Sequence, residues 1–159
     1  MTATETMTVG VVMERRVARS AWVDHLWLPV AVLPGAPELA DWTPLGQSDT
    51  GKRFFAGAFD LELHRTDTAN YRDNLATGAP RIWVAARLSH STPQVIAVTA
   101  DPAEGEAFTE AGDDIVEHVP MAPEIAGVLA AFVAAHHVER AFVKRRRRRW
   151  DADEPDEMA

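Results

Sequence analysis

The sequence predicts an α+β fold in which a mostly antiparallel or mixed sheet of about six strands is covered by a C-terminal helix. Two observations lead to this class: strand patterns follow one another through the first two thirds of the chain, and the helical patterns come late. A doubly wound parallel sheet would need a helix after nearly every strand. A partial barrel is an alternative form of the same predicted sheet.

The strands are predicted from apolar and polar residues that alternate with a period of two. The longest run, residues 54–64, places Phe55, Phe59 and Leu63 on one face. Pro29 has no N–H, so the strand that contains it belongs at an edge or carries a bulge. Residues 95–99 are apolar on both sides, which predicts a central strand. The other predicted strands cover residues 8–16, 26–32, 42–45, 82–88 and 115–119.

Three helices are predicted. A short one covers residues 68–76, ahead of Gly78. The second begins after Asp101, a favourable N-cap residue that is followed by proline, and runs to residue 111. The third begins at Pro123 and ends near residue 137, and its apolar stripe has helical spacing and must pack on the rest of the domain.

The distribution of charge divides the chain into a body and a tail. The 159 residues carry a net charge of −8. Residues 1–143 hold 10 lysines and arginines against 19 acidic residues, whereas residues 144–159 hold 6 against 5. We therefore expect a flexible N-terminus over residues 1–6, a single domain over 7–143 and a charged tail over 144–159, basic at 144–149 and acidic at 151–157.

The tail is the clearest candidate for an interaction site. So many like charges cannot be buried without partners, so the segment is expected to project into water or onto an anionic surface. A tryptophan beside arginines is typical of interface hot spots, although a charged tail is also often merely solvated. The predicted interaction residues are Lys144, Arg145, Arg146, Arg147, Arg148, Arg149 and Trp150.

No pattern typical of catalysis, of a cofactor or of a metal centre is present in the sequence. The chain has no cysteine, which excludes disulfides, thiolate zinc sites and iron–sulfur clusters. Adjacent His136 and His137 would point about 100° apart on a helix, so one packed and one surface histidine are expected. The nucleotide-binding glycine motifs and the nucleophile elbow are absent. Trp83 is a candidate for an exposed aromatic patch, but a core position is the usual place for such a residue.

The expected location is cytoplasmic. Residues 1–7 lack the basic and apolar regions of a signal peptide. No apolar run reaches the length of about 18 residues that a membrane-spanning helix requires.

A series of motifs resembles the uncharacterised bacterial family known as domain of unknown function 3305, over about residues 8–150. The motifs are Val-Met-Glu-Arg-Arg (12–16), Trp-Val-Asp-His (22–25), Pro-Val-Ala-Val-Leu-Pro-Gly-Ala (29–36), Leu-Glu-Leu-His-Arg (61–65), Tyr-Arg-Asp-Asn-Leu (71–75), Val-Thr-Ala-Asp-Pro-Ala-Glu (98–104), Ile-Val-Glu-His-Val-Pro-Met (115–121) and Phe-Val-Ala-Ala-His-His-Val-Glu (132–139). The resemblance implies that the gene lies beside molybdenum-dependent formate dehydrogenases, and hence an accessory or maturation role. It brings no catalytic residues with it.

Three functional hypotheses follow. The first is an accessory protein without catalytic activity, whose body docks a formate dehydrogenase subunit while the arginine run contacts an acidic surface, an anionic cofactor or a membrane face. The second, motivated by the resemblance, is a protein that handles a small ligand or the molybdenum cofactor in a pocket of His25, Glu62, His64, Arg65 and Tyr71. The third is nucleic-acid binding through the arginine run, which the acidic body disfavours.

Overall fold

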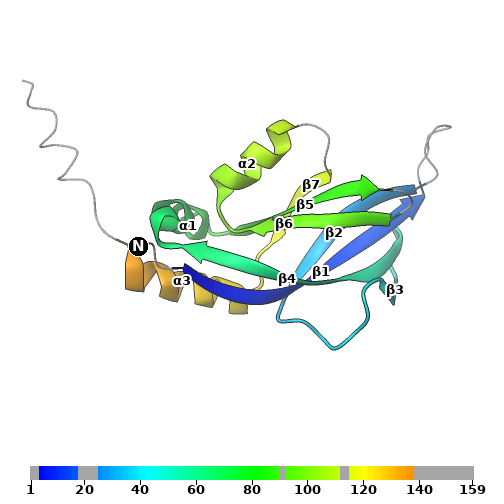
Figure 1. Cartoon of the computed structure of the whole chain (residues 1–159), viewed down its shortest axis with the longest axis horizontal. Helices are drawn as coiled ribbons and strands as arrows, with labels where there is room; N and C mark the ends of the chain where they lie inside the picture. The colour runs from blue at the N-terminus through cyan, green and yellow to red at the C-terminus, as the bar shows by residue number, and fades with distance from the viewer. Residues whose placement is uncertain (1–3, 18–24, 90–91, 112–114, 138–159) are drawn as a thin grey trace, which may run out of the picture.

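The computed structural model describes residues 4–17, 25–89, 92–111 and 115–137. The chain has the predicted α+β composition (Figure 1). Its elements are, in order, β1 (Thr4–Val17), β2 (His25–Pro34), β3 (Thr43–Gln47), β4 (Lys52–His64), the 3₁₀ turn η1 (Arg65–Asp67), α1 (Thr68–Ala76), β5 (Arg81–Ser89), β6 (Thr92–Thr99), α2 (Pro102–Ala111), β7 (Ile115–Pro120) and α3 (Pro123–His136).

The described strands pair antiparallel, as predicted, but they form a four-stranded and a three-stranded sheet in place of the single predicted sheet of about six strands. The first sheet has the order β2-β1-β4-β3, and the second has the order β6-β5-β7. Strand β2 runs beside β7, and β4 runs beside β6, but no ladder of hydrogen bonds joins either pair in the described residues. The sheets therefore do not close into a barrel. Alternation predicts which face of a strand is buried, but it does not identify the neighbouring strand.

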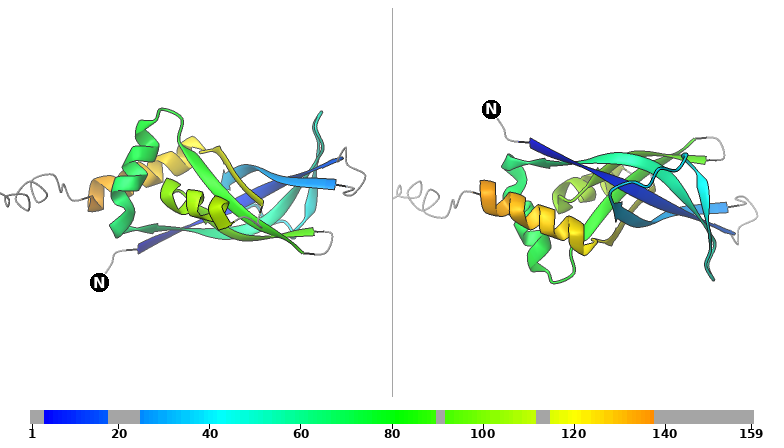
Figure 2. Two further views of the ribbon diagram at one scale, coloured as in Figure 1. Left: turned by 90° about the horizontal axis from the view of Figure 1, so that it is seen from above. Right: turned by 90° about the horizontal axis from the view of Figure 1, so that it is seen from below.

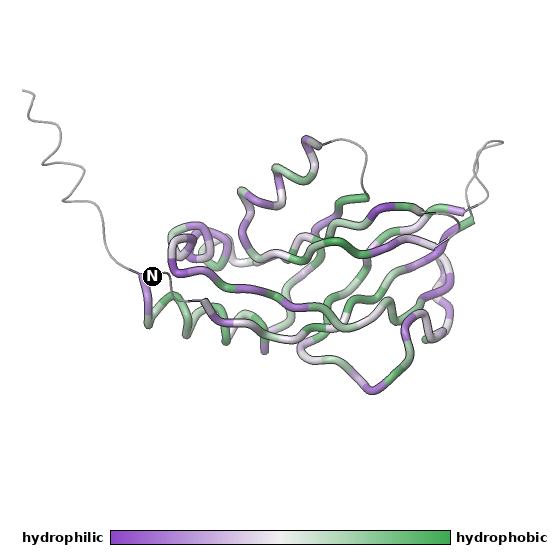
Figure 3. The backbone as a smooth tube through the Cα atoms, in the orientation of Figure 1, coloured by the Kyte–Doolittle hydropathy of each residue, from purple (hydrophilic) through white to green (hydrophobic). Residues whose placement is uncertain are grey.

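One hydrophobic core lies between the two sheets. Met13 and Leu61 reach it from the first sheet, Ile82 and Val84 from the second, and Phe132 from helix α3. The hydrophilic and hydrophobic colours alternate along the strands in Figure 3, as expected for strands with one buried face. This shared core makes the two sheets mutually dependent.

Two details of the strands bear on the predictions. Strand β2 is at the edge of its sheet and its register with β1 shifts beside Pro29, as predicted for a strand that contains this residue. Strand β6 is also an edge strand, with Ile96 40% exposed, so the prediction of a central strand at residues 95–99 is wrong. Its neighbour β5 holds the central position.

A bulge in β4 changes which aromatic side chain reaches the core. Val11 pairs with Gly57 and Val12 pairs with Phe55, so Ala56 is the extra residue. Phe54 consequently shares the core face with its partner Met13, and Phe55 lies on the opposite face. The strict alternation predicted for residues 54–64 is broken at this position.

The helices gather at one end of the molecule. Figure 2 shows α1 and α3 together at the end away from β3. Their contact includes an edge-on pair of rings, with the centroids of Tyr71 and Phe132 6.1 Å apart. Helix α2 begins as predicted, because the Asp101 carboxylate accepts a 2.9 Å hydrogen bond from the amide of Ala103.

Strand β1 connects the two ends of the molecule. Its first residue, Thr4, pairs with His64, and its last residue, Val17, pairs with His25. A strand of 14 residues spans about 45 Å at a rise of about 3.3 Å per residue. Residues at these two ends therefore belong to different surfaces.

Candidate functional site

The candidate site lies at the end of the first sheet that is remote from the helices. We call it the cationic–aromatic cleft and define it by the residues Arg15, His25, Trp27, Trp42, Lys52 and Phe54. Antiparallel pairing places Arg15 directly opposite Trp27 on one side and directly opposite Lys52 on the other. These three side chains therefore share one face of the sheet, the face that carries the core residue Met13 two positions earlier on β1.

Three aromatic rings form the base of the cleft. The centroids of Trp27 and Trp42 lie 5.4 Å apart with the rings nearly perpendicular, and those of Trp27 and Phe54 lie 5.5 Å apart. Trp27 and Phe54 are buried, with 7% and 9% of their surfaces exposed. Edge-to-face pairs of this kind add to the stabilisation from burial alone. The base of the cleft is therefore a packed extension of the core.

Two cations lie over these rings. The Arg15 guanidinium carbon is 5.2 Å from the Phe54 centroid and 5.8 Å from that of Trp27. The Lys52 ammonium is 5.4 Å from the Phe54 centroid. Directly opposite residues of neighbouring strands have their Cβ atoms about 5 Å apart, and like charges in that arrangement repel. Within the described residues no carboxylate forms an ion pair with either cation.

Trp42, which lines the cleft, has a backbone conformation that is unusual for a residue with a large side chain. Its φ angle is 66°, which is the left-handed conformation that a bulky residue rarely adopts. Its amide donates a hydrogen bond to the carbonyl of Phe55, which ties the loop to β4. Such strain persists only where neighbouring contacts hold it, and it is concentrated at functional sites.

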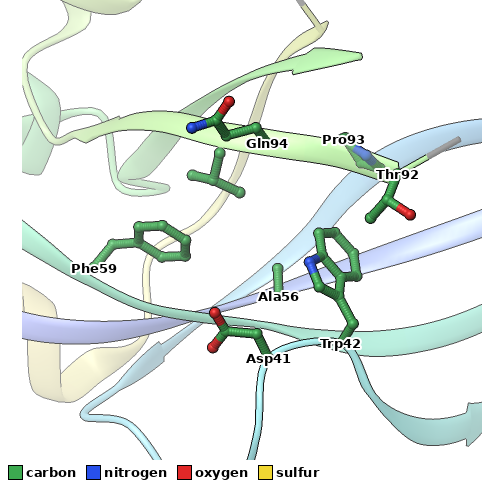
Figure 4. Close-up of a pocket in the computed structure, with 8 residues that line it drawn as sticks. Asp41, Trp42, Ala56, Phe59, Thr92, Pro93 and Gln94 are labelled. Atoms are coloured by element: carbon green, nitrogen blue, oxygen red, sulfur yellow. The ribbon is translucent and has the colours of Figure 1, made fainter. Parts of the chain in front are cut away.

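Three cavities that share lining residues adjoin one another at the cleft, and together we call them the groove. A central cavity of about 250 Å³ is lined by Arg15, His25, the three rings and Thr92. Arg15 and His25 also line a cavity of about 550 Å³ beside the β3–β4 turn. On the other side, Trp42 and Thr92 line a cavity of about 550 Å³ between β4 and β6. Figure 4 shows this last cavity, with Trp42 and the Asp41 carboxylate on one side and Thr92 to Gln94 across from them.

The opposite face of the same strands carries a neutralised set of charges. The carboxylate of Glu14 is fully buried and accepts hydrogen bonds from Nε of Arg16 at 2.9 Å and from Nε of Arg53 at 3.0 Å. It also accepts hydrogen bonds from the hydroxyls of Thr50 and Ser48. We call these five residues the Glu14 network. Arg16 and Arg53 follow Arg15 and Lys52 directly in sequence, so alternation places them on the other face.

The Glu14 network holds the carboxylate in its charged form. Burial by itself would raise the pKa of Glu14, but hydrogen bonds from Thr50, Arg16 and Arg53 outweigh this effect and lower the pKa from 4.5 to about 2. The network thus fixes the β3–β4 turn, which carries Thr50, against β1. That turn forms one wall of the cleft.

The residues predicted to form a polar pocket lie at both ends of the molecule. Glu62, His64 and Tyr71 come together at the helical end: a Glu62 carboxylate oxygen is 3.4 Å from Nε2 of His64, and the amide of His64 donates a 2.9 Å hydrogen bond to the Tyr71 hydroxyl. Arg65 follows in the 3₁₀ turn η1 and is exposed. His25 lies at the other end and lines the cleft. Burial raises the pKa of Tyr71 to about 12.

The remaining candidates from the sequence either pack against other residues of the fold or lie outside the described residues. His136 packs against Phe132, with the ring centroids 4.5 Å apart, and its Nε2 is 3.7 Å from Glu5. His137 is partly buried rather than on the surface, and its Nδ1 is 3.0 Å from the Thr68 hydroxyl. Trp83 is a core residue, 8% exposed beneath helix α2. Lys144 to Arg149 and Trp150 lie outside the described residues.

Sequence reasoning missed most of the cleft. Arg15 and Arg16 mark the end of a predicted strand, and nothing in their spacing distinguishes the cation that is neutralised from the one that is not. A usable signal exists in β4, where Lys52 and Phe54 share one face and Arg53 lies on the other. Cations and aromatic rings on the same face of a strand indicate a cation–π surface.

In the part of the chain that the structure describes, no group of three or more histidine and acidic side chains is arranged to hold a metal ion. None of the helices in those ranges has both the length and the apolar composition that crossing a membrane requires.

The comparisons with known proteins give one match. The model of a family described as a protein of unknown function, DUF3305, matches residues 8–147, which is most of the chain. No curated protein matches, and no solved structure matches.

Proposed function

The chain belongs to the DUF3305 family, and on that premise we propose that it is an accessory protein that docks a subunit of a molybdenum-dependent formate dehydrogenase and assists its assembly or maturation. The dehydrogenase as partner comes from the resemblance set out above. Support for the docking part of this proposal comes from two cations that lie on one face of the first sheet without a carboxylate partner among the described residues.

The observation that carries the proposal is a pair of cations on one face of the first sheet. We call this face, which carries the core residue Met13, the inner face, and the opposite face, which carries Glu14, the outer face. Arg15 and Lys52 repel each other across neighbouring strands and have no carboxylate partner among the described residues. This arrangement of two cations does not stabilise the fold. We therefore attribute it to the binding of an anion. Arginine and tryptophan are also the side chains that dominate protein interfaces.

The basic run of residues 144–149, with Trp150, is a second contact in this proposal. Its arginines are suited to carboxylates or phosphates, and contact with an acidic subunit surface or a membrane face is the role we assign to it. The acidic balance of residues 1–143 disfavours nucleic acid as the partner, because binding to phosphates requires a cationic surface.

A second candidate function is the handling of a small anionic ligand, such as a molybdenum cofactor. The flanking cavities favour it, because about 550 Å³ lies within the range of about 300–1,000 Å³ found for small-molecule sites. The central cavity, which is lined by the three rings and Arg15, measures about 250 Å³ and lies below that range. We therefore rank this function second.

The test is co-purification of the dehydrogenase from the native host with the tagged full chain. The double variant Arg15→Gln, Lys52→Gln should recover at least about tenfold less dehydrogenase, as expected when interface hot spots are removed. The double variant Arg65→Gln, Arg72→Gln is the matched control, because it also removes two positive charges, from exposed positions at the helical end of the molecule. Equal recovery with the double variant and with wild type would refute docking at the cleft.

A further full-chain variant separates the role of the tail. Replacement of residues 144–149 by glutamine should lower recovery further if the basic run is a second contact. Unchanged recovery would remove the tail from the proposal and leave the cleft. Recovery that depends on the tail alone would move the docking site from the cleft to the tail.

A further inference from the structure

The groove also indicates what form the docked group takes, an inference that rests on the proposed function. We propose that the cleft binds an extended peptide segment of the partner in which an acidic residue, a large apolar residue and a neutral or basic residue follow in that spatial order. Three observations lead to this assignment: the size of the central cavity, the lining residues that it shares with a larger cavity on each side, and the charges in those two larger cavities.

The central cavity has the size and lining of a pocket for one side chain. Its volume of about 250 Å³ is too small for most whole ligands, and three aromatic rings form its base. The Arg15 guanidinium lies over one face of Trp27 and one face of Phe54, which leaves less ring surface for the stacking of a flat heterocycle. A single apolar side chain that enters against these rings is the anchor of a typical interface hot spot.

A larger cavity adjoins this pocket on each side. The larger cavities share Arg15 and His25 with it on one side and Trp42 and Thr92 on the other. From Lys52 in the first cavity to Phe59 in the last, β4 runs for about 20 Å. An extended chain of about six residues has this length. A pocket for one anchor between two open stretches thus fits a peptide that passes through the groove.

The charges of the groove set the order of the residues. Arg15 and Lys52 lie on the side of the β3–β4 turn, where they attract a carboxylate. Asp49 lines the same cavity and limits the number of acidic groups that it accepts. Asp41 lines the cavity on the other side, where a further carboxylate would be repelled and a lysine would be attracted. The segment therefore enters with its acidic residue toward Lys52.

The probe for this inference is the peptide acetyl-Gly-Glu-Glu-Phe-Gly-Lys-Gly-amide, titrated against the full chain by calorimetry. Replacement of both glutamates by glutamine, or of phenylalanine by alanine, should weaken binding about tenfold or more. Inorganic pyrophosphate, which carries the charge without the anchor, should neither bind comparably nor displace the peptide. Displacement by pyrophosphate with no effect of the alanine replacement would overturn the peptide assignment in favour of a phosphate ligand.

Two protein variants with the same added ring locate the binding site. Thr92→Phe places a ring at the junction of the central and outer cavities and should abolish binding of the probe. Ile96→Phe adds a comparable ring to an exposed position on the same strand, β6, outside the lining of these cavities, and should leave binding unchanged. Equal affinities of the two variants would overturn the assignment.

The outcomes separate this inference from the proposed function. Capture of the dehydrogenase that depends on Arg15 and Lys52, together with no binding of the probe, would leave docking at the cleft intact and refute the extended peptide. Binding of the probe that Thr92→Phe abolishes, together with no capture of the dehydrogenase, would support the peptide groove and refute the dehydrogenase as partner.

Discussion

Basic residues on the two faces of the first sheet have different surroundings. On the outer face, Arg16 and Arg53 both donate to the buried carboxylate of Glu14. On the inner face, Arg15 and Lys52 lie over aromatic rings and form no ion pair with a described carboxylate. Since the four cations occupy neighbouring positions on β1 and β4, the difference comes from the face and not from the composition. Charge on the outer face is neutralised within the fold, whereas charge on the inner face is not neutralised by any described carboxylate.

Removal of Glu14 should give the largest effect on stability. In Glu14→Ala the two arginines lose their buried partner, and the hydroxyl of Thr50 loses its acceptor. We expect a loss of about 3 kcal/mol in the free energy of unfolding, at the lower end for a broken buried pair because both arginines are partly exposed. Urea denaturation measures this loss. The control Glu62→Ala removes an exposed carboxylate and should cost less than about 1 kcal/mol.

Acid should also lower the free energy of unfolding, because it protonates the Glu14 carboxylate. The pKa of Glu14 is lowered from 4.5 to about 2 in the folded state, so its contribution to stability is complete above pH 4.5 and is lost as the pH falls through about 2. A shift of this size corresponds to about 3 kcal/mol. Unfolding curves of wild type and Glu14→Gln, measured at several pH values, should converge in acid. A constant difference between them down to pH 2 would contradict the role assigned to the carboxylate.

The smallest effects on stability are expected for substitutions of two adjacent residues of β4, Lys52 and Arg53. Arg53→Gln removes a hydrogen bond to a charged group and should cost about 1–2 kcal/mol. Lys52→Gln removes a cation–π contact and a like-charge repulsion of similar size, so the free energy of unfolding should change by less than about 0.5 kcal/mol. The two variants carry the same net charge, which makes them matched. Equal losses of stability would show that the two faces do not differ as described.

The sequence predicts the local elements of this fold better than their assembly. Period-two alternation and helix-start residues such as Asp101 depend on neighbours in the chain, and the elements that they predict are present. The number of sheets, the edge position of β6 and the bulge at Ala56 depend on which strands meet across the core. No alternation pattern contains that information.

The candidate site was hidden from the sequence for a related reason. Glu14 is buried although glutamate is almost never buried unless it is paired, and its partners come from β1 itself, from β4 and from the β3–β4 turn. The cleft likewise joins β1, β2, β4 and the loop that carries Trp42. The prediction from motifs did include His25, which lies in the cleft, but it grouped this residue with Glu62 and His64 at the other end of the molecule.

Amide hydrogen exchange of the full chain, with and without the captured partner, tests the central claim most directly. Binding at the cleft should slow exchange in residues 25–28 and 41–56, which contain Trp27, Trp42 and Lys52, and should leave helices α1 and α3 unchanged. Protection confined to the helical end, or to residues outside the cleft, would contradict the assignment of the inner-face cations to a partner.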